Sequence, residues 1–179
     1  MLQIRIPEFE GWDEAKEIFV NKKAQVLNLE HSLVSISKWE AKWHKPFLSK
    51  IEKTQEETID YIKFMTLTQN VDPDVYNRLT NENVLQIRDY IDNPMSATTF
   101  KEDKGTPNRE IITSELIYYW MVASNIPFEC QKWHLNRLLT LIRICSIKNQ
   151  PQKKLGKNEI LSRNAALNAA RKKKLGTKG

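Results

Sequence analysis

Two side chains spaced four residues apart could act together in catalysis or metal binding. Cys130 and His134 would share one face of a helix, where a thiolate and an imidazole can bind a metal ion or act as nucleophile and base. A structural zinc site needs four converging ligands, and the further candidates, His31, His44 and Cys145, form no Cys-x-x-Cys motif. A nucleophilic pair would also need an orienting third group and an oxyanion site. We therefore interpret Cys130 as a buried cysteine beside a partly buried histidine, and expect no metal ion, cofactor or catalytic residue.

Other enzyme motifs are missing from the sequence as well. It contains no Gly-x-Gly-x-x-Gly, Gly-x-x-x-x-Gly-Lys or Gly-x-Ser-x-Gly, and it has five glycines in all. Glu56, Glu57 and Asp60 could form a carboxylate site, but they lie in the first turns of a predicted helix, where negative charge favours the helix dipole. The sequence thus indicates a protein that binds other macromolecules and is not an enzyme.

The length and amino-acid composition of the chain indicate one folded domain with an appendage. The chain has 179 residues, of which 40% are hydrophobic and 28% are charged, and its five Trp, five Tyr and six Phe exceed what a disordered chain carries. Two cysteines are too few for the disulfide framework of a small secreted protein, and the first residues contain no signal-peptide h-region. No apolar stretch approaches the roughly 20 residues of a membrane span. We expect a protein of a reducing compartment that does not enter a membrane.

The positive charge is concentrated near the C-terminus. The net charge is +6, of which residues 150–179 contribute +8 and residues 1–149 contribute −2. We therefore predict a helical domain over 1–149 and a basic C-terminal tail over 150–179. The tail could be a solubilising segment, or it could bind an acidic protein surface or nucleic acid, without sequence preference because it has no aromatic residue to stack on bases. Its predicted polyanion-binding residues are Lys153, Lys154, Lys157, Arg163, Arg171, Lys172, Lys173 and Lys174.

The spacing of apolar residues, two apart in strands and three or four apart in helices, predicts the elements that would position the candidate residues. Leu2–Ile6 alternates apolar and polar side chains and is followed by Pro7, which predicts a short edge strand. Segments 17–20 and 25–29 could close a small hairpin around residues 21–23. The rest of the chain reads as helix, so the predicted fold is mainly α, a compact helical domain with a small N-terminal β element and a basic C-terminal extension.

In the first half of the domain, helical spacing of apolar residues and helix-start signals predict several helices. Residues 29–44 carry apolar side chains at three- and four-residue intervals, and Pro46 ends the pattern. Thr54–Glu57 is a capping box, in which the side chain of each of these two residues can accept the backbone N–H of the other. Asp72–Pro73 and Thr80 are two further helix starts. We therefore predict four successive helical segments before residue 94.

Two amphipathic helices are predicted in the second half. Residues 96–107 have no period and are predicted to be an exposed loop, and Thr106–Pro107 opens a helix that Asn125–Pro127 ends. The two helices would form an αα-hairpin with a tight turn. The segment Asn158–Lys173 could be helical, since Ala and Arg are strong helix formers, but it has little to bury, so without a partner we expect it to be extended, frayed or mobile. The apolar stripe of the second helix consists of Leu135, Leu138, Leu139, Ile142 and Cys145.

The αα-hairpin could instead be a helix-turn-helix reader of DNA. In that case the side chains that face away from the second stripe would contact phosphates or bases. Its first helix is too aromatic for a simple supporting helix, and its basic residues are sparse, so core packing is the favoured interpretation. The residues concerned are Lys132, Asn136, Arg137 and Arg143.

Several aromatic side chains of this region are candidates for a binding surface. Tyr118 and Tyr119 cannot both point inward with Trp120, so we expect some of the rings to lie at the surface, as they do in protein-binding patches. Trp and Tyr also dominate the energetics of protein interfaces. The predicted partner-binding residues are Tyr118, Tyr119, Phe128 and Trp133.

Three stretches of sequence carry a resemblance to a family of phage proteins. They are ELIYYWM at 115–121, NIPFECQKWHLNRLLTLIR at 125–143 and LEHSLVSISKWE at 29–40. With its small size, near-neutral body and charged C-terminus, the chain resembles bacteriophage tail assembly chaperones. The resemblance implies a virion assembly factor with no catalytic residue, which binds tape measure and tail tube proteins in the host cytoplasm. The basic tail would equally suit a connector or neck protein of the virion or a non-specific nucleic-acid-binding protein, and self-association is a further open alternative.

Overall fold

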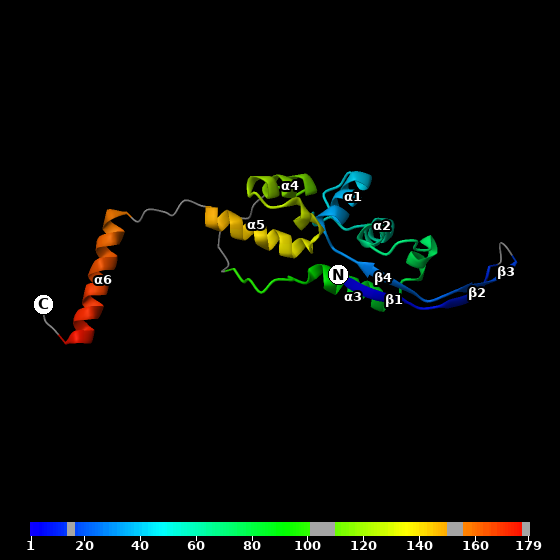
Figure 1. The fold of residues 1–179 in the computed structure, drawn as a ribbon, viewed down its shortest axis with the longest axis horizontal. Coiled ribbons are helices and arrows are strands. Elements are labelled where there is room, and N and C mark those ends of the chain that lie inside the picture. Colours follow the sequence, from blue (N-terminus) through cyan, green and yellow to red (C-terminus); the bar gives the residue numbers. More distant parts are fainter. Residues whose placement is uncertain (14–16, 101–109, 150–155, 177–179) are drawn as a thin grey trace. The chain divides into compact units, whose positions relative to one another are not determined.

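The computed structural model describes residues 1–13, 17–100, 110–149 and 156–176. Contacts within the chain divide it into two compact units, Met1–Ile147 and Lys148–Gly179, which are described separately below. The first unit is mainly helical with a small N-terminal β element (Figure 1), so the predicted fold class is confirmed for this unit. None of the helices in the described part of the chain is long and apolar enough to cross a membrane.

The β element is a two-stranded ribbon built from four short strands. They are β1 (Leu2–Ile6), β2 (Phe9–Asp13), β3 (Ile18–Lys22) and β4 (Gln25–Leu29). β1 pairs antiparallel with β4, and β2 pairs antiparallel with β3. In Figure 1 the ribbon continues from the first pair into the second. Among the described side chains of the ribbon, those in the core come from β1 and β4, with Ile4 and Ile6 on one strand and Leu27 and Leu29 on the other.

The structure confirms the predicted edge strand and corrects the predicted hairpin. Segments 17–20 and 25–29 were expected to pair with each other, but they belong to β3 and β4, which follow each other along the same side of the ribbon. Their partners are β2 and β1. Sequence reasoning missed β2 because Gly11 and Asp13 are poor strand formers and the segment does not alternate cleanly.

Five α-helices and two 3₁₀ helices complete the first unit. They are α1 (Leu33–Trp43), α2 (Gln55–Met65), η1 (Pro73–Arg78), α3 (Asn81–Asp92), α4 (Ser114–Ala123), η2 (Phe128–Lys132) and α5 (Leu135–Asn149). The predicted capping box at Thr54 and Glu57 is confirmed at the start of α2, and the predicted caps Asp72 and Thr80 start η1 and α3. The local helix-start signals therefore located these elements well.

The predicted αα-hairpin differs from the observed one in two respects. α4 begins at Ser114 with Thr113 as its N-cap, and Ile112 precedes the helix; the expected start at Thr106–Pro107 lies outside the described residues. The connection to α5 is not a tight turn, because it contains η2. α4 packs against α1. Its position is therefore set by a helix about 70 residues earlier in the chain.

Trp39 of α1 lies near the centre of the hydrophobic core. It is almost completely buried, its ring centroid lies 5.1 Å from that of Phe47, and its Nε1–H donates to the Glu57 carbonyl oxygen at 2.8 Å. A buried indole N–H needs such an acceptor. The remaining core side chains of α1, α2, α4 and α5 are Leu33, Ile36, Tyr61, Ile62, Met65, Ile117, Met121, Leu135, Leu138 and Ile142.

The described part of the second unit after α5 contains α6 (Lys157–Leu175), after which Gly176 adopts a left-handed conformation with φ of 64°. Glycine is favoured at this position because it has no Cβ to clash. We expected an extended or frayed segment here, and the structure shows a helix of 19 residues instead. Within this unit, every described side chain of α6 is exposed. The strong helix formers Ala and Arg account for this helix, whose described side chains are all exposed.

Candidate protein-binding surfaces

The structure brings two of the predicted partner-binding residues together where α4 faces η2. The rings of Tyr118 and Phe128 have centroids 6.4 Å apart, and the Tyr118 hydroxyl donates to Gln131 Oε1 at 2.9 Å. Tyr118 is partly buried, and burial raises the pKa of its hydroxyl. Phe128 is 54% exposed. Tyr118 therefore supports the base of a surface on which Phe128 is accessible.

The other two predicted residues, Tyr119 and Trp133, do not take part in this ring contact. Tyr119 is 65% exposed, and it makes no ring contact with any described residue; Val122, one turn further along α4, is also exposed. The guanidinium of Arg137 lies over the Trp133 ring, 4.3 Å from its centroid, so this indole already has a partner. We define the α4–η2 surface by Tyr118, Tyr119, Val122 and Phe128.

Sequence reasoning missed a second group of exposed aromatic side chains, which belongs to β2 and β3. Phe9 is 50% exposed, Trp12 is 58% exposed and Phe19 is 72% exposed. Trp12 and Phe19 are directly opposite each other in the strand register, and their ring centroids lie 6.3 Å apart. The signal available in the sequence was the pair of aromatic residues that flanks the polar run from Asp13 to Glu17.

Phe9 lies on the opposite face of the β2–β3 ribbon from Trp12. Its ring covers Gly11, and a Cβ atom at that position would lie 2.6 Å from Phe9 Cζ. Glycine thus provides the space that the ring occupies. The two faces of the ribbon therefore carry different aromatic groups, one formed by Phe9 and the other by Trp12 with Phe19.

Two contacts fasten the base of the β2–β3 ribbon to η1. Lys22 Nζ lies 2.7 Å from Asp72 Oδ2, and Arg78 Nη1 donates to the Pro7 carbonyl oxygen at 3.0 Å. The hydrogen bond from Lys22 holds the pKa of the Asp72 carboxyl below its usual value. These exposed contacts orient the ribbon and add little stability.

Two of the three histidines considered as metal ligands, His31 and His134, are buried and hydrogen-bonded, whereas His44 is exposed at the end of α1. His31 Nδ1 bonds to the Tyr61 hydroxyl, and the His31 and His134 rings have centroids 5.0 Å apart. His134 Nε2 bonds to the Tyr90 carbonyl oxygen at 2.9 Å, while its Nδ1 accepts the Asn136 N–H at 3.3 Å. Both ring nitrogens of His134 are thus occupied by the backbone.

Burial keeps both histidines neutral at physiological pH. Loss of solvation, with a smaller contribution from His134, lowers the pKa of His31 to about 3. Loss of solvation also lowers the pKa of His134. Over the described residues, no three His, Cys, Asp or Glu side chains are placed to hold a metal ion, and His134 has no free nitrogen with which to activate Cys130.

The acidic residues considered as a carboxylate site have structural roles. Glu57 Oε2 accepts the Thr54 N–H at 2.8 Å, and its Oε1 pairs with Lys45 at 2.5 Å; the Lys45 hydrogen bond lowers the pKa of Glu57. Burial opposes ionisation of Asp60, but bonds from Lys42 and Lys63 outweigh it and lower its pKa. All these bonds hold α2 in place.

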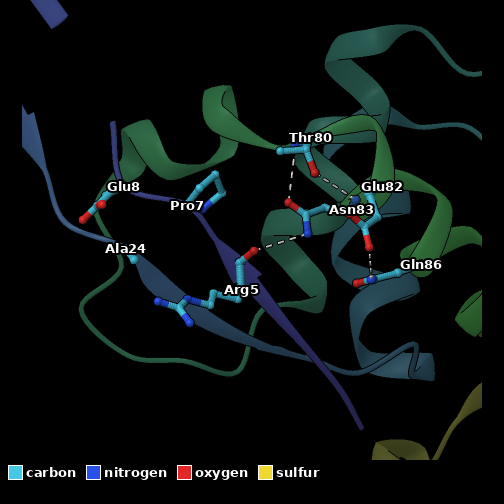
Figure 2. A pocket seen from close by; sticks show the side chains of 8 residues that line it. All are labelled: Arg5, Pro7, Glu8, Ala24, Thr80, Glu82, Asn83 and Gln86. Atoms are coloured by element: carbon cyan, nitrogen blue, oxygen red, sulfur yellow. Dashed lines mark hydrogen bonds between the residues drawn. The ribbon is translucent and has the colours of Figure 1, made fainter. Parts of the chain in front are cut away.

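A polar pocket of about 470 Å³ lies between β1 and the start of α3 (Figure 2). The Asn83 Nδ2 group spans it and donates to the Arg5 carbonyl oxygen at 3.4 Å. The charged side chains at its edge, Arg5, Glu8 and Glu82, point in different directions in Figure 2. They do not converge on one point, so this pocket offers no charge pattern that selects a ligand.

The residues considered as DNA-reading groups are engaged within the fold. Asn136 Nδ2 donates to the carbonyl oxygens of Ile91 and Asn93 at 2.9 and 2.8 Å, and the Arg143 guanidinium lies 4.1 Å from the centroid of the Phe100 ring. Arg137 lies over Trp133, as described above. Lys132 is exposed. This arrangement favours core packing over a helix-turn-helix reader.

The predicted polyanion-binding residues are described in part. Lys153 and Lys154 lie outside the described residues, as does the side chain of Lys157 at the start of α6. The side chains of Arg163 and of residues 171–174 are exposed and form no ion pair within the described part of the second unit. Five positive charges are therefore available to solvent on α6.

No protein-family model, curated protein or solved structure matches this chain. Its function must therefore be inferred from its own surfaces. The described buried polar groups are used for structure, whereas exposed side chains offer two aromatic surfaces, at α4–η2 and at β2–β3, and one basic helix. These surfaces are the candidate binding sites in the described part of the chain.

Proposed function

We propose that this protein is a bacteriophage virion assembly factor that binds partner proteins during tail morphogenesis, in the manner of a tail assembly chaperone. The resemblance at residues 115–143 and 29–40 supports the family, and the α4–η2 surface supports binding. The tape measure protein is the proposed partner. The host cytoplasm, where tails assemble, is the proposed location.

The observation that carries the binding role is the distribution of apolar residues on α4. Apart from Ser114 and Glu115, every residue of this helix is apolar or aromatic. Ile117 and Met121 are fully buried, yet Tyr119 and Val122 are exposed on the same helix. A helix that is apolar on all sides is usually buried on all sides. The exposed side of α4 is thus suited to a partner protein.

The size of the expected effect follows from the residue types. Exposed aromatic side chains that become buried at an interface are typical binding hot spots, each worth about 2 kcal/mol or more. Tyr119 and Phe128 are the two most exposed aromatic residues of the surface. Replacing both with Ala should therefore weaken binding by at least about a hundredfold.

The test is co-expression of the full chain with a tape measure protein from the same genome. The wild-type chain should co-purify with it, and the double variant Tyr119→Ala/Phe128→Ala should not. Leu85→Ala is the matched control, because Leu85 is 58% exposed but lies on α3. If the wild-type chain fails to co-purify, the chaperone function is rejected; if the double variant co-purifies as well as the control, the surface is wrong.

A second candidate function is binding of a polyanion through α6. It is supported by five exposed basic side chains on a helix whose described side chains are all exposed. Binding of a nucleic acid in this way releases counterions, so its affinity should fall as the salt concentration rises. The slope of log K against log salt concentration should be about −0.7 to −0.9 per phosphate contact. Replacing residues 171–174 with Gln should reduce that slope by about 3 to 4. An unchanged slope would exclude α6 as the binding element.

A further inference from the structure

We propose that the β2–β3 ribbon is a second protein-binding surface, and that it binds a segment presenting arginine or lysine beside apolar side chains. This surface shares no residue with the α4–η2 surface. The inference is therefore independent of the function proposed above.

The aromatic side chains of the ribbon are not needed by the core. Trp12 and Phe19 are both more than half exposed, and their described ring contact is with each other. A two-stranded ribbon by itself is marginally stable in water. Two large exposed rings on such a ribbon are costly in water, and a partner that covers them would stabilise the ribbon.

One face of the ribbon combines these rings with a carboxylate. Strand pairing places Glu10 opposite Asn21, and Trp12 opposite Phe19, on the same face. The Asn21 Nδ2 group donates to Glu10 Oε1 at 3.0 Å, which orients the carboxylate. Neighbouring pairs on one face of a ribbon are about 7 Å apart. A guanidinium stacked on Trp12 can therefore also reach Glu10.

This combination is chemically selective for a cation with apolar neighbours. A guanidinium or ammonium group is attracted to the face of an indole within about 6 Å of its centroid. Its charge would be paired with Glu10, and the apolar side chains beside it would cover Phe19. Arginine is the better match, because its planar group can stack and pair at the same time.

The remaining charges of the ribbon favour the same kind of partner. Glu8 and Glu17 are exposed and form no ion pair with the described residues. Lys22 lies on the other face and is paired with Asp72, and the exposed Lys23 at the base of the ribbon offsets one of the three glutamates Glu8, Glu10 and Glu17. Like charges would oppose the pairing of two such ribbons from two copies. An acidic, aromatic surface therefore selects a basic partner and disfavours nucleic acid.

The base of the ribbon is already oriented for binding. The Lys22–Asp72 pair and the hydrogen bond from Arg78 to Pro7 join it to η1. Less conformational freedom is then lost when a partner is bound. The Phe9 ring, held over Gly11 on the opposite face, is outside the proposed site.

Three synthetic peptides of about five helical turns each test the inference by fluorescence anisotropy with the full chain. The first carries Arg and Leu side by side on one face, at three- and four-residue spacing, the second replaces Arg with Glu, and the third replaces Leu with Ser. The first should bind most tightly. Trp12→Ala/Phe19→Ala should weaken its binding at least about tenfold, and Glu10→Lys should have a similar effect.

The control is Tyr119→Ala/Phe128→Ala, which removes the α4–η2 surface and should leave this peptide binding unchanged. Far-UV circular dichroism and the thermal midpoint check the fold of each variant. If Trp12→Ala/Phe19→Ala disrupts the pairing of β2 with β3, the test of the proposed surface is Glu10→Lys, which keeps both rings. Equal binding of the Glu peptide, or wild-type affinity in Glu10→Lys, would overturn the inference, whereas failure to bind a tape measure protein would reject the proposed function alone.

Discussion

The carboxylate of Glu40 in α1 accepts the backbone N–H of Ser114 at 2.7 Å, and so caps a helix that begins 74 residues later. Its other oxygen accepts the Phe47 N–H at 2.7 Å. Both N–H groups are buried with the carboxylate. Glu40 thus fixes the start of α4, and with it the position of the α4–η2 surface.

Glu40→Ala should therefore destabilise the protein. The substitution leaves two buried N–H groups without an acceptor, at about 1–3 kcal/mol each. We expect the free energy of unfolding in urea to fall by about 2–6 kcal/mol, and binding through α4 to weaken as well. Glu40→Gln, which retains one acceptor, should lose about half as much. If Glu40→Ala is as stable as the wild-type chain, the Ser114 N–H at the start of α4 does not depend on Glu40 as its acceptor.

Stability should decline as the pH falls below about 6.5. The pKa of His31 is about 3 in the folded protein and near its ordinary value when unfolded, so the unfolded chain takes up a proton first. The stabilisation is complete above the unfolded pKa and is lost as the pH falls towards the folded pKa, at up to about 1.4 kcal/mol per pH unit.

The interval from pH 6.5 to 5 isolates this effect, because carboxylates there are still ionised. The groups facing His31 are the Tyr61 hydroxyl and the His134 ring, and His134 has a lowered pKa as well. Urea unfolding at several pH values should show this slope, and His31→Gln should reduce it. A stability that is flat over this interval would contradict the buried, neutral assignment.

Asn136→Ala should distinguish a structural from a DNA-reading role for α5. Asn136 Nδ2 donates to the carbonyl oxygens of Ile91 and Asn93 at the end of α3. Removing it should lower the free energy of unfolding by about 1–3 kcal/mol and leave DNA affinity unchanged in a gel-shift titration. A loss of DNA affinity without loss of stability would favour the reading role.

Local features of the fold could be predicted from the sequence. The Thr54–Glu57 capping box and the Asp72 and Thr80 caps lie within three residues of their partners, so short-range spacing identifies them. The stripe Leu135–Ile142 on α5 was likewise readable, because helical periodicity is a strong signal. Crowding next to Trp120 predicted that Tyr118 and Tyr119 could not both point inward, and Tyr119 is the exposed ring.

Long-range relationships could not be predicted in this way. The His31–Tyr61 bond and the contact between the His31 and His134 rings join distant segments, and spacing says nothing about them. The same is true of the Glu40 cap of α4. Pairing of β2 with β3 was missed because the Gly11 position weakens the strand pattern that would have revealed it.

Hydrogen exchange of the full chain, alone and in complex with its co-expressed tape measure protein, tests the central claim most directly. We expect the amides of α4 and η2, from Ser114 to Lys132, to become more protected in the complex while those of α3 stay unchanged. A complex that forms without added protection in α4 and η2 would contradict the assignment of this surface.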